Sequence, residues 1–260
     1  MPFFDNSYAT IHYEIYGDQG SLVILVNGYT RPCRDFRQLA TFLSKQGYRV
    51  LIFDNRGAGE TKALRFDTLS DIAFDLLSVA DFLGFKEFHL VGFSMGGVIA
   101  RIVVHNEKAR VKSLSLVSTP ADLSFVKNSA EKPWGKTVDS IESKFSGYVS
   151  MEFLEKNGPL IKAMAKTILE KMDSGFEEGA RAQRKALFKT PVKYFSLKEI
   201  TVPTLLIHGT EDLVVSHEHS LLLREQKIDT KLVLYKGAGH LLLLEKSKEL
   251  YHDVASFISS

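Results

Sequence analysis

Gly92-Phe93-Ser94-Met95-Gly96-Gly97 is the stretch of sequence that decides the fold. It follows an apolar run at 88–91 that is typical of a buried strand, and it leads into 98–104, which is apolar enough for a core helix. A serine between glycines on a strand-to-helix turn is the pattern of a nucleophile elbow, which lifts the serine Oγ above the sheet. The pattern therefore predicts Ser94 as a nucleophile, and a glycine-rich turn with an uninvolved serine is the alternative.

The composition indicates one large α/β domain and argues against several other classes. The chain has 260 residues, and because 45% are hydrophobic we expect a sizeable core rather than disorder. Lys and Arg number 33 against 31 Asp and Glu, so the net charge of +2 gives no electrostatic case for nucleic acid or an anionic membrane. The single cysteine, Cys33, excludes an internal disulfide framework and a cysteine-based metal cluster.

The N-terminal residues show no signal-peptide pattern, and no apolar run approaches the ~20 residues of a membrane helix. We therefore expect a cytoplasmic protein that is a monomer or a small homo-oligomer. Its expected partner is a small-molecule substrate, with no nucleic acid and no membrane.

Strand-like and helix-like segments alternate along most of the chain. Continuous apolar strands separated by helices predict a mostly parallel sheet with helices on both faces. The segment 10–16 alternates apolar and polar residues instead, as an antiparallel edge strand would. The expected strands lie at 22–26, 49–53, 88–91, 113–117, 203–208 and 231–235, and the expected helices at 35–46, 70–83, 98–104, 216–226 and 241–258.

The alternation stops at about residue 121 and resumes after 195. Within 121–195 no strand pattern is convincing, and helical patches carry many lysines and glutamates. The segment is therefore predicted to be a helical insertion, with 1–120 and 196–260 forming the α/β core. Because the segment leaves and re-enters the core beside strand ends, we expect it to lie over Ser94 as a lid.

A serine nucleophile needs a base and an acid that orients the base. Among the eight histidines, His240 is favoured because it lies in a glycine-rich turn just after the last expected strand. Ligand sites in open α/β sheets form at such carboxyl ends. His217 and His219 are the rival bases. Ordinary structural roles suit the strand histidines, which are His12, His89 and His208.

Asp212 follows the expected strand at 203–208 and is the favoured acid. It can hold the imidazole tautomer and stabilise the imidazolium. The competing interpretation is an Asp that serves only the turn, and Glu211 and Asp122 are alternative acids. The order Ser94, Asp212, His240 is that of α/β-hydrolases and differs from the chymotrypsin and subtilisin orders.

Over essentially its full length, the sequence resembles the α/β-hydrolase superfamily. The resemblance implies a mostly parallel eight-stranded sheet, helices on both faces and a lid inserted after the sixth strand. The motifs that carry it are Asn27-Gly28-Tyr29, the segment 54–61, Gly92-Phe93-Ser94-Met95-Gly96-Gly97, His208-Gly209-Thr210-Glu211-Asp212 and Gly237-Ala238-Gly239-His240.

The resemblance also implies an oxyanion hole made by the N–H groups of Met95 and Tyr29. Asn27 replaces the histidine that is usual in that loop. Neither the glycines of 54–61 nor His217-Glu218-His219 has phosphate- or metal-binding spacing, so no cofactor and no metal are expected.

The function that these features favour is a serine hydrolase that cleaves a carboxylic ester or related acyl bond. The apolar residues Leu123, Phe125 and Trp134 either shape the substrate pocket or simply pack the insertion on the core. The elbow is similar to those of carboxylesterases, enol-lactonases, carbon–carbon bond hydrolases and perhydrolases, so these activities and acyl transfer stay open. A small-molecule receptor or a scaffold on the same fold is the alternative of another class.

Overall fold

The computed structural model describes residues 2–63, 65–124, 135–172 and 174–260. Its sheet has the order β1-β2-β4-β3-β6-β7-β8-β9, and β5 pairs with β2 beside this path. All pairs from β4 to β9 are parallel, whereas β2 is antiparallel to β1, β4 and β5. The strands are β1 (Phe3–Asn6), β2 (Ala9–Tyr16), β3 (Leu22–Val26), β4 (Arg49–Phe53), β5 (Lys62–Ala63), β6 (Phe88–Phe93), β7 (Val111–Val117), β8 (Thr204–Gly209) and β9 (Lys231–Tyr235).

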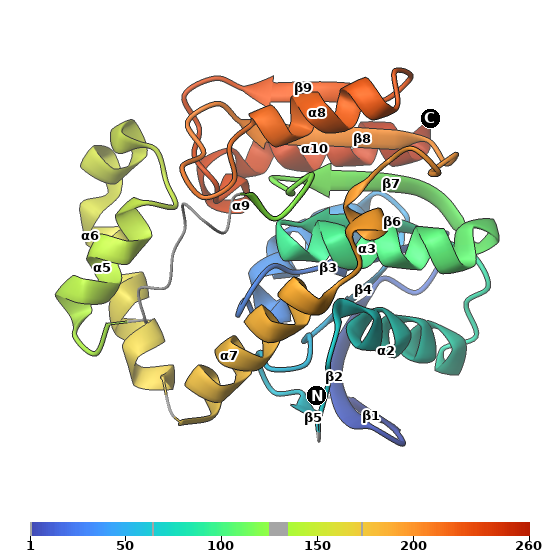
Figure 1. Cartoon of the computed structure of the whole chain (residues 1–260), viewed down its shortest axis with the longest axis horizontal. Coiled ribbons are helices and arrows are strands. Elements are labelled where there is room, and N and C mark those ends of the chain that lie inside the picture. Colours follow the sequence, from blue (N-terminus) through green and yellow to red (C-terminus); the bar gives the residue numbers. More distant parts are fainter. Residues whose placement is uncertain (1, 64, 125–134, 173) are drawn as a thin grey trace.

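Helices cover both faces of this sheet, as Figure 1 shows. Apolar side chains of α2, α3 and α8 belong to the core on one face, and those of α1, α9 and α10 belong to the core on the other. The helices are α1 (Arg37–Lys45), α2 (Leu69–Phe82), α3 (Met95–Glu107), α5 (Val138–Ser146), α6 (Met151–Lys171), α7 (Ser174–Lys189), α8 (Glu218–Gln226), α9 (Leu242–Glu245) and α10 (Ser247–Ser259), with 3₁₀ turns η1 (Cys33–Phe36), η2 (Lys108–Arg110) and η3 (Val192–Phe195).

The mostly parallel sheet with two helical layers is confirmed. Strands β3 and β6 are buried along their whole length, because helices cover both of their faces. The expectation that 10–16 forms the edge of the sheet is wrong, since β2 lies between β1 and β4. The edge strand at this end of the sheet is β1, whose four residues alternate between exposed and half-buried. The expected helix at 241–258 is divided into α9 and α10 at Lys246.

The segment between β7 and β8 contributes α5, α6 and α7. Figure 1 shows α5 and α6 on the side to which the arrowheads of β7 and β9 point, so they lie beyond the carboxyl ends of these strands. Arg101 of α3 joins the two ends of the segment: its completely buried guanidinium donates to the Pro120 carbonyl oxygen at 2.6 Å and the Phe195 carbonyl oxygen at 2.8 Å. Among the described residues, no helix has the length and apolar character needed to cross a membrane.

Candidate active site

Ser94 lies at the turn from β6 to α3 in a conformation that few non-glycine residues adopt. Its φ of 53° and ψ of −121° store backbone strain, which persists where the surrounding structure holds it. The Ser94 N–H donates to the Val117 carbonyl oxygen of β7 at 2.8 Å. A Cβ at Gly92 would lie 2.6 Å from the Gly96 carbonyl oxygen, so this close turn requires glycine. The local structure is that of a nucleophile elbow.

His240 lies in the loop that follows β9, and its side chain contacts Ser94. Its Nε2 lies 3.1 Å from Ser94 Oγ. The ring packs against Phe93 and Tyr148, with centroid distances of 5.0 Å and 5.9 Å, and the His240 N–H donates to the Tyr148 carbonyl oxygen at 2.9 Å. The imidazole is therefore held from the core strand on one side and from the loop between α5 and α6 on the other.

Asp212 lies in the turn after β8 and completes a chain of three side chains. Its Oδ2 lies 2.7 Å from His240 Nδ1, while Oδ1 accepts from the N–H groups of Val214 at 2.9 Å and Val215 at 2.8 Å. Burial raises the pKa of this carboxyl, but His240 and then His208 lower it by more, so the pKa lies well below its usual range. Asp212 is therefore ionised at neutral pH and favours a proton on His240 Nδ1.

The rival residues from the sequence lie elsewhere in the structure. The Asp122 carboxylate accepts from the Ser124 N–H at 2.7 Å and lies 4.0 Å from His219 Nδ1. His219 Nδ1 also accepts from the Ala121 N–H at 3.2 Å. His217 forms the N-cap of α8. The structure thus brings Ser94, His240 and Asp212 together, whereas Asp122 and His219 form a separate pair.

The loop after β3 approaches Ser94 closely. A Cβ at Gly28 would lie 3.1 Å from Ser94 Cβ, so the backbone of this loop borders the hydroxyl. Asn27 braces the loop, because its Nδ2 donates to the Pro32 carbonyl oxygen at 2.8 Å and its Oδ1 accepts the Gly28 N–H at 2.8 Å. These two hydrogen bonds of the Asn27 side chain therefore stabilise the conformation of the loop.

Helix α7 contacts the same loop. Gln183 of α7 accepts the Thr30 N–H at 2.7 Å and donates to the Arg56 carbonyl oxygen at 2.7 Å. The Tyr29 hydroxyl donates to the Ala180 carbonyl oxygen at 3.0 Å. The segment between β7 and β8 is therefore hydrogen-bonded, through α7, to the loops that follow β3 and β4.

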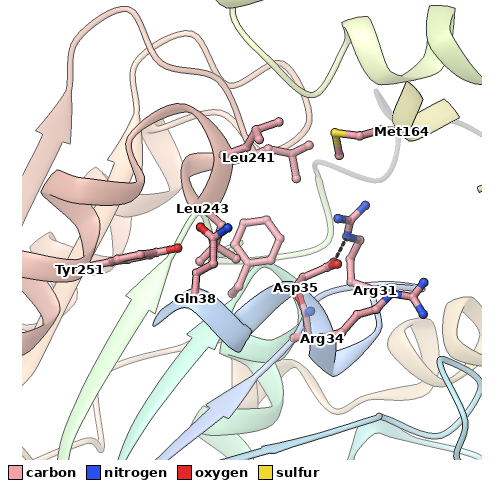
Figure 2. Close-up of a pocket in the computed structure, with 11 residues that line it drawn as sticks. Arg31, Arg34, Asp35, Gln38, Met164, Leu241, Leu243 and Tyr251 are labelled. Carbon is pink, nitrogen blue, oxygen red and sulfur yellow. Dashed lines mark hydrogen bonds and ion pairs between the residues drawn. The ribbon is translucent and has the colours of Figure 1, made fainter. Parts of the chain in front are cut away.

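A pocket of about 240 Å³ is lined by residues that directly precede Ser94 and directly follow His240 in the chain, and Figure 2 shows its lining. Phe93 and Leu241, the neighbours of Ser94 and His240 in the chain, line it together with Met164 of α6. Its polar side carries Arg31, whose Nε donates to Asp35 Oδ2 at 2.6 Å. The pocket can accept an apolar group and presents charged groups opposite it.

Of the pocket residues named from the sequence, Leu123 is half-buried and packs on the core formed by α2 and α3. Phe125 and Trp134 lie outside the described residues. Met164 and Leu241 line the pocket beside the site but were not named from the sequence, since no motif marks them.

His12, Cys33 and Asp54 form a buried group whose side-chain donor atoms lie within 4.8 Å of one another. The Asp54 carboxylate bonds to His12 Nδ1 at 2.8 Å and accepts the N–H groups of Cys33 at 2.6 Å and Glu60 at 2.8 Å. Burial, and then Asp54, raise the pKa of the Cys33 thiol well above its usual range. The group thus ties β2 to two loops, and its thiol stays protonated.

A mostly parallel sheet that presents a serine, an acid and a histidine after the carboxyl ends of three of its strands, here β6, β8 and β9, defines the α/β-hydrolase class. The sequence family described as serine aminopeptidase, S33, matches residues 17–247, and the chain belongs to this family within the α/β-hydrolase superfamily.

Relatives and solved structures share the full length of the fold. The chain is 24% identical over 260 residues to 3-oxoadipate enol-lactonase 1 of Acinetobacter baylyi, covering 96% of this chain and 94% of that protein. It is 26% identical over 265 residues to a bifunctional esterase/perhydrolase of Acinetobacter calcoaceticus, covering 96% of each. An enol-lactonase from Burkholderia xenovorans superimposes over the whole of both chains with a TM-score of 0.86 at 21% identity. The protein is therefore a hydrolase enzyme.

Proposed function

We propose that this hydrolase cleaves a carboxylic ester or related acyl bond of a small molecule through Ser94, His240 and Asp212. The observation that carries the proposal is the continuous contact from Ser94 Oγ to His240 Nε2 at 3.1 Å and from His240 Nδ1 to Asp212 Oδ2 at 2.7 Å. A receptor on this fold does not need these three groups in contact, whereas a serine hydrolase does.

In the proposed first half-reaction, Ser94 Oγ attacks the acyl carbon while its proton passes to His240 Nε2. Asp212 stays ionised and stabilises the imidazolium that forms. The tetrahedral intermediate collapses when His240 returns the proton to the leaving oxygen, which releases the alcohol and leaves the acyl group on Ser94.

In the second half-reaction, His240 accepts a proton from water as that water attacks the acyl carbon. The bond to Ser94 Oγ then breaks, the serine takes its proton back from His240, and the carboxylic acid is released. In a lactone the leaving alcohol remains attached to the acyl chain, so the same steps open the ring.

The oxyanion is assigned to the N–H groups of Tyr29 and Met95. Met95 is the first residue of α3, where an N–H has no acceptor within the helix. Around Tyr29, the Gly28 N–H donates to Asn27 and the Thr30 N–H to Gln183. Removing one such donor typically costs ~3 kcal/mol of transition-state stabilisation. Contacts of the neighbouring amides thus support Tyr29 as the second donor.

We also propose that the segment 121–195 acts as a lid that excludes water and sets specificity. Two contacts support this role: the Thr30 N–H of the loop after β3 donates to Gln183, and the His240 N–H donates to the Tyr148 carbonyl oxygen. A third is Glu245 of α9, whose carboxylate accepts the Gly239 N–H at 2.9 Å and the Ser150 hydroxyl at 2.6 Å. Because Ser150 caps α6, Glu245 links this helix to the loop that carries His240.

The pocket beside the site is proposed to receive the acyl chain. Its apolar wall of Phe93, Leu241 and Met164 suits a short hydrocarbon, and its volume of about 240 Å³ limits the chain length. Met164→Trp fills part of this space and is therefore expected to shift the preference toward shorter acyl groups.

The test uses p-nitrophenyl esters of increasing acyl length beside simple lactones. Wild type is expected to turn over at least one of them, and Ser94→Ala is expected to remove that turnover while circular dichroism shows an unchanged fold. His240→Ala is expected to lose nearly as much, because the two side chains act as a unit. Turnover by Ser94→Ala at the wild-type rate would overturn the proposal.

A further inference from the structure

The Asp212 carboxylate is shared by two histidines, although the proposed mechanism uses one. His240 Nδ1 lies 2.7 Å from Oδ2, and His208 Nε2 lies 3.1 Å from the same oxygen. His208 is completely buried in β8, four residues before Asp212. Asp212 lies between His208 and His240, and His208 does not itself contact Ser94.

The orientation of the His208 ring follows from its other contacts. Nε2 also lies 2.8 Å from the Val215 carbonyl oxygen, so it faces two oxygens that carry no proton. Nε2 must therefore carry an N–H, which is shared between Asp212 and Val215. On the opposite side of the ring, Nδ1 lies 2.6 Å from the hydroxyl of Ser220, at the start of α8. The ring is therefore held on both sides, by Asp212 and Val215 at Nε2 and by Ser220 at Nδ1.

We propose that His208 is a positioning residue that holds the Asp212 carboxylate against the His240 imidazole, with Ser220 fixing the His208 ring. This inference rests on the proposed function, because it assigns His208 a role through Asp212. It extends the proposed triad into a chain of five side chains, Ser94, His240, Asp212, His208 and Ser220, of which all but Ser94 are buried.

Loss of the His208 N–H removes one restraint on the carboxylate. The carboxylate keeps its backbone donors on Oδ1, but Oδ2 is then held by His240 alone and can turn away from it. The other titratable groups that act electrostatically on this region are His219 of α8 and Tyr148, and the variants below leave both in place.

The chain offers a matched control for the removal of a buried strand histidine. His89 of β6 is also buried and bonds through Nδ1 to the Ser113 hydroxyl at 2.8 Å, but at the opposite end of its strand from Ser94. We compare His208→Leu with His89→Leu, and with His208→Gln, whose amide can restore an N–H toward Asp212. Ser220→Ala removes one hydroxyl and is the second variant if His208→Leu does not fold.

The expected result for His208→Leu is a fall in kcat of about 10–100-fold, the loss found when hydrogen-bond partners of metal-ligating side chains are removed. KM should stay near the wild-type value, since His208 acts through Asp212 and does not line the pocket. His208→Gln should recover most of kcat, Ser220→Ala should lose severalfold, and His89→Leu should match wild type in both kcat and KM.

Two outcomes separate this inference from the proposed function. Turnover that persists in Ser94→Ala would remove the serine mechanism itself. If Ser94→Ala is inactive but His208→Leu and Ser220→Ala keep the wild-type kcat, His208 has a structural role alone and the inference is overturned. An equal loss of kcat in His89→Leu would also overturn it.

Discussion

Asp212→Asn replaces one carboxylate oxygen by an amide nitrogen, and the surrounding contacts determine whether the nitrogen takes the place of Oδ1 or of Oδ2. At Oδ1 an NH₂ group would face the N–H groups of Val214 and Val215 and leave both without an acceptor, at about 1–3 kcal/mol each. At Oδ2 it faces His240 and His208. The His208 N–H keeps the Val215 carbonyl oxygen at 2.8 Å, and His240 can change tautomer. The nitrogen is therefore expected at Oδ2.

This orientation forces His240 Nδ1 to accept from the new amide. The imidazole proton then lies on Nε2, which points at Ser94 Oγ, so His240 can no longer accept the serine proton. The expected loss in kcat is about 10⁴-fold, as for the same change in a triad of known mechanism. At about 1.36 kcal/mol per tenfold, this corresponds to about 5.4 kcal/mol of transition-state stabilisation.

The assay is steady-state hydrolysis of the best p-nitrophenyl ester at pH 7.5, with circular dichroism to verify the fold. Asp122→Asn is the matched control, because it makes the same chemical change in a half-exposed carboxylate beside His219. Its kcat should stay within about twofold of wild type, as expected away from the reacting groups. An Asp212→Asn rate within tenfold of wild type, or an equal loss in Asp122→Asn, would refute the tautomer argument.

Three other predictions concern Glu245, Cys33 and the stability contributed by Asp212. In Glu245→Gln, Ser150 or Gly239 loses an acceptor, so urea unfolding should show a loss of about 1–2 kcal/mol; an unchanged midpoint would contradict the link between α6 and the His240 loop. Cys33 should resist iodoacetamide at pH 8 until the protein unfolds, because its raised pKa keeps the thiol protonated; rapid native alkylation, seen by mass spectrometry, would contradict this. Folding lowers the pKa of Asp212, so the ionised carboxylate stabilises the folded state. The difference in free energy of unfolding between wild type and Asp212→Asn should therefore be constant at neutral pH and should decrease once the pH is lowered past about 4, the pKa of Asp in an unfolded chain. A difference that increases as the pH is lowered would contradict this prediction.

The positions of Ser94, Asp212 and His240 could be predicted because each follows a strand that the sequence marks clearly. Parallel strands bring their carboxyl ends to one edge, so residues that follow successive strands converge there even when they are far apart in the chain. Position after a strand does not by itself decide between Asp212 and Asp122 as the acid, since both follow strands. The choice depends on the turn that brings the Asp212 carboxylate to His240, which is a tertiary contact.

Other features could not be predicted for similar reasons. The sequence favours an ordinary structural role for His208, because a strand pattern indicates which side chains face a helix layer. It does not show that the turn after β8 folds back onto the His208 ring. The edge strand β1 has four residues, too few for a periodic pattern. The helix expected at 241–258 contains no glycine or proline to mark a break, and its division at Lys246 accompanies the contact of Glu245 with Gly239 and Ser150.

The most direct test of the central claim is to map the covalent adduct of a fluorophosphonate probe by peptide mass spectrometry. Such probes react with an activated serine, so the adduct is expected on Ser94 in wild type. It should be absent in Ser94→Ala and formed far more slowly in His240→Ala, because the imidazole activates the hydroxyl. An adduct on a different residue, or labelling of Ser94→Ala at the wild-type rate, would contradict the account.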